Sequence, residues 1–235
     1  MKKSVLMLAM FLIALSATAQ QQALTTFGNG SLKKESRELG SFTTLNAKGH
    51  FQIRLVPGAE PKITIEAESN LLELIVTEVK NGELTIAPAK GRLFKASGSN
   101  KIIIKVPADA LTALTYKGSG TVTSRKPLKN DMNITLDGAG SATLEMASGN
   151  TTALLLGTGM LTLGGKTGNF KCVVKGDGLV VAEDMECDRA EIDVQGTGSA
   201  KVYSVKSIKG RINGSGNIAF GGNPKDRDLK KEGTG

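Results

Sequence analysis

The sequence predicts an all-β protein, a parallel β-helix or β-solenoid with coils of about twenty residues. A Gly-x-Gly triplet recurs six times, and the steps between its first glycines are 20, 19, 19, 20 and 18 residues. Apolar and polar residues alternate on both sides of each triplet, as they do in strands with one buried face. The chain also has 29 glycines among 235 residues, so its backbone passes many positions that favour glycine. A fixed period of this length indicates units that stack on their neighbours, and we expect the coiling to be right-handed.

The first 19 residues are expected to be a signal peptide. Lys2 and Lys3 precede an apolar run over 5–15, and Ala17-Thr18-Ala19 has the small-x-small pattern of a cleavage site before Gln20. The run is shorter than the ~20 residues that span a bilayer, which disfavours the alternative of a membrane anchor. We therefore expect no transmembrane anchor and an exported protein in the periplasm, on the outer surface or outside the cell.

Residues 20–39 are expected to form a loose leader, and residues 40–110 a β-rich region that continues or caps the coils. Strand alternation is clear in Phe51, Ile53 and Leu55. Three further features are a tight turn at Asn81-Gly82, either a helical turn or a strand at 70–73, and an exposed loop at 90–101.

Residues 111–222 are expected to form the Gly-x-Gly solenoid, with two short strands in each coil. Glycine suits both corner positions because a tight corner needs backbone angles that side chains resist, and equivalent corners stack directly on each other. The alternative is six unrelated hairpin turns in an antiparallel sandwich, which would not keep so even a step. The predicted corners are Gly118, Gly120, Gly138, Gly140, Gly157, Gly159, Gly176, Gly178, Gly196, Gly198, Gly214 and Gly216.

Residues 223–235 are interpreted as a polar tail or as the stump of one more coil, because 223–228 cannot supply an alternating apolar strand. The two cysteines, Cys172 and Cys187, fall mid-strand and near a corner. Export allows a disulfide between them, but this spacing favours two buried free thiols.

The sequence predicts no catalytic, metal-binding or cofactor-binding residues. His50 is the only histidine, and we interpret it as a surface residue because no Ser or Cys nucleophile motif accompanies it. One histidine and two cysteines at unsuitable spacing make no zinc site, and only the corner at Asp177 carries a carboxylate that could serve calcium. No triplet has the third glycine and helix of a dinucleotide site.

An acidic run leaves one enzymatic alternative, a carbohydrate-active β-helix resembling a polysaccharide lyase or hydrolase. Such chemistry needs two carboxylates that face one cleft about 5–9 Å apart. The residues of the run are expected mostly to face solvent, so we favour a non-enzyme. They are Glu183, Asp184, Glu186, Asp188, Glu191 and Asp193.

The net charge of +8 would suit anionic glycans or membrane surfaces. Apart from Lys90, Arg92, Lys95 and Lys101, the basic residues are scattered, and they do not alternate with aromatic rings. We therefore expect no nucleic-acid partner.

In the middle coils, outward positions turn apolar where neighbouring coils carry polar residues. An apolar surface on both faces of a sheet is normally covered. We hypothesise that this patch docks the N-terminal segment, a second subunit through self-association, or a ligand. The patch consists of Leu154, Leu156, Met160, Val173, Leu179 and Val181.

Several motifs, in this order, resemble the head GIN domain family, whose members are described as "putative auto-transporter adhesins" of mostly exported bacterial proteins. They are the export signal ending in Thr18-Ala19-Gln20, the strand 51–56 followed by Pro57-Gly58, the strand 102–107, the serial triplets from Gly118, and the closing segments 214–218 and 222–224. The resemblance covers residues 40–224 and implies surface adhesion, without site residues. It favours an exported, non-catalytic adhesion-type or structural binding module of the bacterial envelope or surface, whose partner is an unknown surface protein or glycan.

Overall fold

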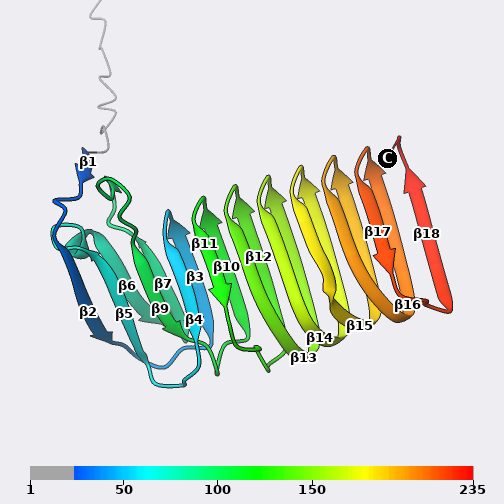
Figure 1. Ribbon diagram of the computed structural model, residues 1–235, viewed down its shortest axis with the longest axis horizontal. Helices are drawn as coiled ribbons and strands as arrows, with labels where there is room; N and C mark the ends of the chain where they lie inside the picture. The colour runs from blue at the N-terminus through cyan, green and yellow to red at the C-terminus, as the bar shows by residue number, and fades with distance from the viewer. Residues whose placement is uncertain (1–23, 235) are drawn as a thin grey trace, which may run out of the picture.

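The computed structural model describes residues 24–234, and most of them form a β-solenoid of about six turns. Successive coils lie side by side along the long axis of the molecule (Figure 1). The predicted all-β solenoid is therefore confirmed. Its elements are β1 (Leu24–Phe27), β2 (Leu32–Glu38), β3 (Thr44–Gly49), β4 (Gln52–Val56), β5 (Lys62–Glu68), the 3₁₀ turn η1 (Leu72–Leu74), β6 (Ile75–Lys80), β7 (Glu83–Pro88), β8 (Arg92–Lys95), β9 (Ile103–Pro107), β10 (Ala113–Gly118), β11 (Thr121–Ser124), β12 (Met132–Gly138), β13 (Ser141–Gly157), β14 (Met160–Gly176), β15 (Leu179–Gly196), β16 (Ser199–Gly214), β17 (Asn217–Gly221) and β18 (Asp226–Glu232).

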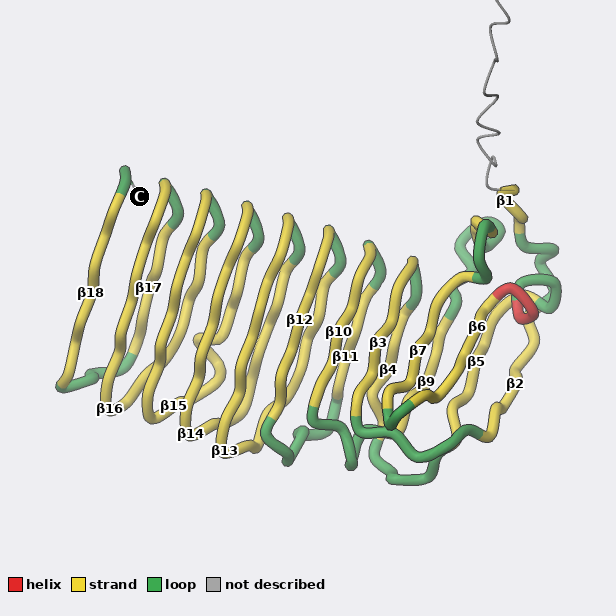
Figure 2. The backbone as a smooth tube through the Cα atoms, turned by 180° about the vertical axis from the view of Figure 1, so that it is seen from behind, coloured by secondary structure: helices red, strands yellow, loops and turns green. Residues whose placement is uncertain are grey.

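The coils are flattened, so their strands form two layers that pack against each other (Figure 2). Layer 1 holds the strands that precede each corner: β7, β3, β10, β12, the C-terminal parts of β13 to β16, and β18. Layer 2 holds the strands that follow each corner: β9, β4, β11, the N-terminal parts of β13 to β16, and β17. The long strands β13 to β16 run from layer 2 into layer 1 around the edge opposite the corners. All pairings within these two layers are parallel.

The core lies between the layers and is built from in-register columns of inward side chains. Leu155 pairs with Leu136 in one coil and with Val174 in the next, and all three are buried. Each coil alone has too few neighbours to bury its apolar face, so burial comes from stacking, as the sequence period predicts.

The predicted glycine corners form one edge of the stack. A Cβ placed on Gly176 would lie 2.8 Å from the backbone oxygen of Gly157, and one on Gly157 would lie 2.9 Å from that of Gly138. Both residues have positive φ, 113° and 94°. A side chain at either position is therefore disfavoured for two reasons: the positive φ, and the clash with the backbone of the preceding coil.

Sequence reasoning missed the first corner of the stack, Gly49-His50-Phe51. Gly49 pairs with Gly118, but Phe51 stands where later coils have glycine. The hydroxyl of Tyr116 bridges this corner and the next: it donates to the Gly49 oxygen at 2.8 Å and accepts from the Gly120 amide at 2.9 Å. Burial raises the pKa of Tyr116, so the hydroxyl stays protonated and can keep donating.

Antiparallel strands close the N-terminal end of the stack. β5 pairs antiparallel with β9, β2 with β5, and β6 with β7. The antiparallel strands interrupt the parallel repeat at this end, which limits further stacking. β1 pairs with β8, and the ring of Phe94 in β8 lies 6.1 Å from that of Phe51 in the core.

The structure adds detail to several expectations. Residues 20–39 were expected as a leader, but β1 and β2 form within them, and β8 forms within the loop predicted at 90–101. The ambiguous segment at 70–73 contributes to the helical turn η1. The predicted signal peptide, 1–19, lies outside the described residues.

Of the two alternatives for residues 223–235, the structure has a further coil over 226–232. These residues form β18, parallel to β16. Two inward positions of β18 carry Arg227 and Lys231 instead of apolar residues, and the Arg227 guanidinium lies 5.6 Å from the Phe220 ring centre. Charges at inward positions of a final strand discourage further stacking.

Glu68 is a buried carboxylate that fastens the N-terminal segment to this end of the stack. It accepts hydrogen bonds from the Gly30 amide at 2.5 Å, from the Ser97 amide at 2.8 Å and from the Ser97 hydroxyl. These bonds, chiefly that from the Ser97 hydroxyl, lower the pKa of Glu68 below its usual 4.5. A carboxyl whose pKa is lower in the folded state stabilises the fold above its unfolded pKa, and this stabilisation is lost as the pH falls through the folded value.

We therefore expect amide exchange of residues 28–31 to rise as the pH falls below 4.5, relative to the intrinsic rate. Glu68→Gln should raise exchange there already at neutral pH and flatten the pH dependence, because the charge that strengthens these bonds is gone. Hydrogen-exchange mass spectrometry measures both effects, with exposed Glu73→Gln as the control. Identical profiles for Glu68→Gln and the wild type would contradict this role.

Candidate functional site

The outward side chains of the two layers, the loops at the edge opposite the corners, and the corner edge itself are available to a partner. The residues of the predicted apolar patch do lie at outward positions, but they are divided between the two layers instead of forming one patch. Leu154 pairs with Val173 in layer 1, and Met160 pairs with Leu179 in layer 2. Met160 is 45% exposed, and the other five residues are half-buried. The patch is therefore two smaller apolar areas that face opposite directions.

The N-terminal segment does not cover either area over the residues that the structure describes. From Leu24 onward this segment pairs with β8 and β5, at the N-terminal end of the stack. This corrects the hypothesis that the segment docks on the patch. The cause is the antiparallel pairing of β2, which the alternation of the sequence does not reveal.

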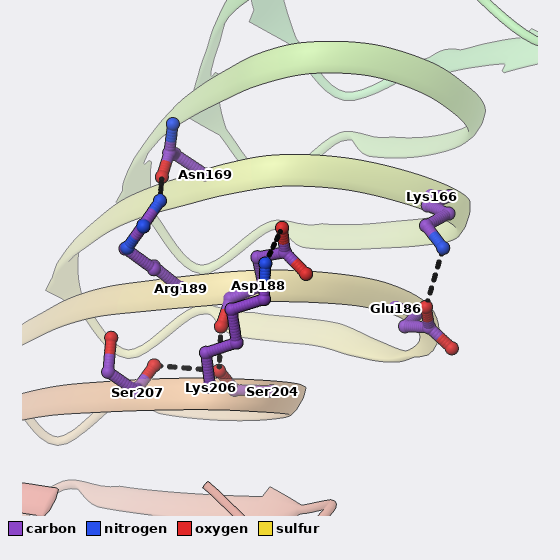
Figure 3. Close-up of polar contacts among 8 residues, drawn as sticks. All are labelled: Lys166, Asn169, Glu186, Asp188, Arg189, Ser204, Lys206 and Ser207. Atoms are coloured by element: carbon purple, nitrogen blue, oxygen red, sulfur yellow. Dashed lines mark hydrogen bonds and ion pairs between the residues drawn. The ribbon is translucent and has the colours of Figure 1, made fainter. Parts of the chain in front are cut away.

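The acidic run is divided between the layers, and several of its carboxylates meet a cation from a neighbouring coil. Figure 3 shows the pairs of Lys166 with Glu186 and of Lys206 with Asp188. Glu186 lies 2.8 Å from Lys166, Asp188 lies 2.9 Å from Lys206, and Glu191 lies 3.8 Å from Lys171. The hydrogen bond from Lys206 lowers the pKa of Asp188. Glu183, Asp184 and Glu186 belong to the layer-2 part of β15, whereas Glu191 and Asp193 belong to its layer-1 part.

A glycoside-cleaving pair needs one carboxyl group that is protonated and faces a second across a cleft. In the acidic run, three of the six carboxylates are instead paired with lysines, and the run is spread over both layers. This arrangement suits a solvated, salt-bridged surface, and such exposed pairs contribute little to stability.

The middle residues of the corners form a polar row along the corner edge. His50 is exposed, and its Nδ1 lies 3.1 Å from the Ser119 hydroxyl of the next coil. Asp177 accepts a hydrogen bond from the Thr197 hydroxyl. The only histidine thus contacts a corner serine that has no base–orienter arrangement around it.

Both cysteines are buried free thiols, as expected from their positions. Burial raises the pKa of Cys172 to about 12 and that of Cys187 to about 11. The Cys187 thiol donates to the Tyr203 oxygen at 3.2 Å. Because the thiolate is the reactive form, neither residue is suited to nucleophilic chemistry.

A groove of about 650 Å³ lies on the outward side of layer 2, near the edge opposite the corners. We call it the cationic groove because Arg54, Arg125 and Lys126 line it without any acidic residue. Sequence reasoning missed it, because Arg54 and Arg125 are far apart in the chain. They come together only because β4 and β11 are neighbours in the stack.

Within residues 24–234, no three or more His, Cys, Asp and Glu side chains gather in a way that could hold a metal ion. The same residues include no helix long and apolar enough to cross a membrane.

A protein-family model described as "putative auto-transporter adhesin, head GIN domain" matches residues 41–224. No curated protein matches the sequence.

Solved structures share the fold. A "putative adhesin" from Bacteroides fragilis superposes with a TM-score of 0.82 at 22% identity, over 89% of this chain and 97% of that one. A "putative lipid binding protein" from Parabacteroides distasonis has a TM-score of 0.69 at 23% identity, over 90% and 98% of the two chains. A "putative adhesin" from Parabacteroides merdae has a TM-score of 0.65 at 19% identity, over 89% and 97%.

Proposed function

Because the chain belongs to the head GIN domain family, described as putative auto-transporter adhesins, we propose that it is an exported, non-catalytic module that binds a partner at the bacterial envelope or surface. The observation that carries the proposal is that the two faces of each strand have different roles. Inward residues and corner glycines build the stack, while outward residues vary from coil to coil. Such a scaffold presents a long, rigid surface to a partner, as repeat proteins do.

The competing function is a carbohydrate-active β-helix enzyme. The lysine pairing of Glu186, Asp188 and Glu191, and the opposite directions of the two parts of the acidic run, favour binding over hydrolysis. The raised pKa values of both thiols favour the same conclusion for nucleophilic chemistry.

The test is a binding screen on the chain from Gln20 onward, against purified glycans and extracellular-matrix proteins. The same polysaccharides are incubated with the protein, and their chain length is measured before and after. The proposal expects binding to at least one target with unchanged chain length. Depolymerisation that is lost on Asp177→Asn or Asp193→Asn would overturn it, and so would the absence of binding to every target.

Export is tested separately by expressing the full chain and sequencing the N-terminus of the protein outside the cytoplasm. Cleavage is expected before Gln20, after Ala17-Thr18-Ala19. Retention of the entire protein in the cytoplasm with residues 1–19 intact would contradict this part of the proposal.

The apolar areas give a prediction about partners. If the layer-1 area docks a second copy, Leu156→Asp should lower the mass of the protein in solution from that of an assembly to that of a monomer, because a charge would enter the apolar contact. Light scattering measures the mass, with Thr152→Asp on an exposed position of the same strand as the control. If the wild type and Leu156→Asp are the same monomer with the same stability, this area does not mediate self-association.

A further inference from the structure

The cationic groove is a built feature of the fold between two loops that interrupt the regular coils. β4 ends at Val56 and β5 begins at Lys62, while β11 ends at Ser124 and β12 begins at Met132. The later coils wrap this edge as continuous strands, but here the chain leaves the layer as loops. The outward surfaces of β4 and β11 therefore lie at the bottom of a hollow lined by Val56, Pro57, Arg125 and Lys126.

The floor of the groove is a row of hydrogen-bonding side chains in parallel register. Thr121 pairs with Gln52, and Thr123 pairs with Arg54 in β4 and with Thr143 in β13. Successive coils are ~4.8 Å apart, so the row repeats hydroxyl and amide groups at a fixed spacing. These groups can both donate and accept hydrogen bonds, which suits the hydroxyls of a sugar chain.

The three cations of the groove have no ion-pair partner within residues 24–234. Arg54, Arg125 and Lys126 are all exposed, so their charge is available to a ligand. Arginine matches carboxylate and phosphate oxygens with two parallel hydrogen bonds, which fixes the orientation of the anion.

Three nearby carboxylates, Glu66, Asp109 and Glu145, form no ion pair with the groove cations. Glu66 lies 2.6 Å from Lys105, and the hydrogen bond from Lys105 lowers its pKa, to which the charge of Arg54 also contributes. Asp109 accepts a hydrogen bond from the Gly58 amide at 2.9 Å. Glu145 extends toward the next coil, where its oxygens would lie 2.9 Å from a Cβ on Gly164.

We propose that the cationic groove binds an acidic polysaccharide. Arg54 and Arg125 bind its anionic groups, and the hydroxyl and amide side chains on the floor of the groove bind its hydroxyls. The groove volume of about 650 Å³ falls in the usual range of ligand sites. Val56 and Pro57 give the sugar rings an apolar wall. The inference rests on the proposed surface-binding function and names the ligand class and the place where it binds.

Two other polyanions fit the groove less well. A membrane surface would need large, exposed apolar anchors beside the cations, but none of the large exposed apolar side chains among residues 24–234 lines the groove. A single-stranded nucleic acid would need aromatic rings on which its bases stack, and the groove lining has none.

The test compares two double variants that remove the same charge. Arg54→Gln/Arg125→Gln changes the groove, and Arg92→Gln/Arg211→Gln changes two exposed arginines outside it. Kd is measured by calorimetry for polygalacturonate and heparin, with neutral dextran as the uncharged probe. Phosphatidylglycerol vesicles and a single-stranded oligonucleotide are the other probes, and thermal melting confirms that all variants fold.

The proposal expects both acidic polysaccharides to bind and dextran not to. The groove variant should bind them roughly tenfold or more weakly, with a smaller dependence of Kd on salt, and the control variant within about twofold of the wild type. Equal binding by the groove variant and the wild type would overturn the groove assignment while leaving the surface-binding function intact. Equal weakening in both variants would show a general charge attraction and also overturn it, as would binding to vesicles or the oligonucleotide but not to polysaccharide. Depolymerisation of the probe would instead overturn the proposed function.

Discussion

Gly176→Ala is expected to destabilise the protein by about 4 kcal/mol. The methyl group would meet the Gly157 backbone oxygen at 2.8 Å while the residue is held at a φ of 113°. Backbone strain of this kind costs about 1–3 kcal/mol, and overpacking against a rigid neighbour costs a similar amount. The Gly157 oxygen belongs to the backbone of the preceding coil, so it cannot rotate away as a flexible side chain would.

Gly82→Ala is the matched control. Gly82 also has a positive φ, 76°, but a Cβ there would have nothing within 4 Å. Its cost should be about 1–2 kcal/mol, from backbone conformation alone. Denaturant unfolding of both variants measures the difference, which combines the contact with the neighbouring coil and the greater backbone strain at a φ of 113°. Equal losses in the two variants would contradict a stacked corner at Gly176.

Phe170→Ala is the second substitution with a large expected effect, a loss of about 3–5 kcal/mol. Phe170 is 1% exposed, and its in-register neighbours in the adjacent coils are the small residues Thr151 and Ala190. Neither neighbour is large enough to fill the space that the ring leaves. The cavity therefore persists in the middle of the stack.

This substitution should also reveal how the stack unfolds. Because each coil contacts mainly its neighbours, a weakened middle coil separates the stability of the coils before it from that of the coils after it. Calorimetry is expected to show a broader or double transition for Phe170→Ala. Phe170→Leu, which retains most of the volume, should lose less, and Phe27→Ala, at a position 65% exposed, should change stability by about 0.5 kcal/mol or less. A loss for Phe170→Ala as small as that for Phe27→Ala would contradict the packing.

The repeating part of the fold was predictable because two local rules act on each residue. Period-two alternation separates inward from outward residues, and the even spacing of the triplets from Gly118 to Gly216 places the corners above one another. Neither rule depends on distant parts of the chain.

The two ends of the stack were predicted only as alternatives: a β-rich region that continues or caps the coils, and a polar tail or the stump of one more coil. There is a physical reason for this. β18 is polar except for Leu229, and it pairs with β16 through a backbone ladder, which requires no alternating side-chain pattern. The first corner has Phe51 in place of a glycine, and it pairs with a coil that begins only at Ala113. The Tyr116 hydroxyl joins this corner to the next through hydrogen bonds, and no pattern in the sequence predicts them.

The candidate sites were predicted less well, because they depend on which segments become neighbours. The apolar patch was identified residue by residue, but its division between two layers follows from the bend at each corner. The cationic groove joins Arg54 to Arg125 across an inserted segment that forms the N-terminal cap, so no local motif marks it.

The stacking of successive corners, on which the whole account depends, can be tested most directly by cross-linking. Asp177 and Thr197 are the middle residues of adjacent corners, and their side chains are hydrogen-bonded. Adjacent coils are ~4.8 Å apart, within the range of Cα separations that a disulfide spans. Thr158 and Thr197 are two coils apart, at about twice that spacing and beyond the ~7 Å limit.

The decisive measurement is peptide mapping by mass spectrometry after mild oxidation of two double variants. Asp177→Cys/Thr197→Cys should form an intramolecular disulfide nearly completely, and Thr158→Cys/Thr197→Cys should not, while Cys172 and Cys187 stay reduced in both because they are buried. A disulfide in the second variant, or none in the first, would contradict a stack in which each corner lies directly on the one before it.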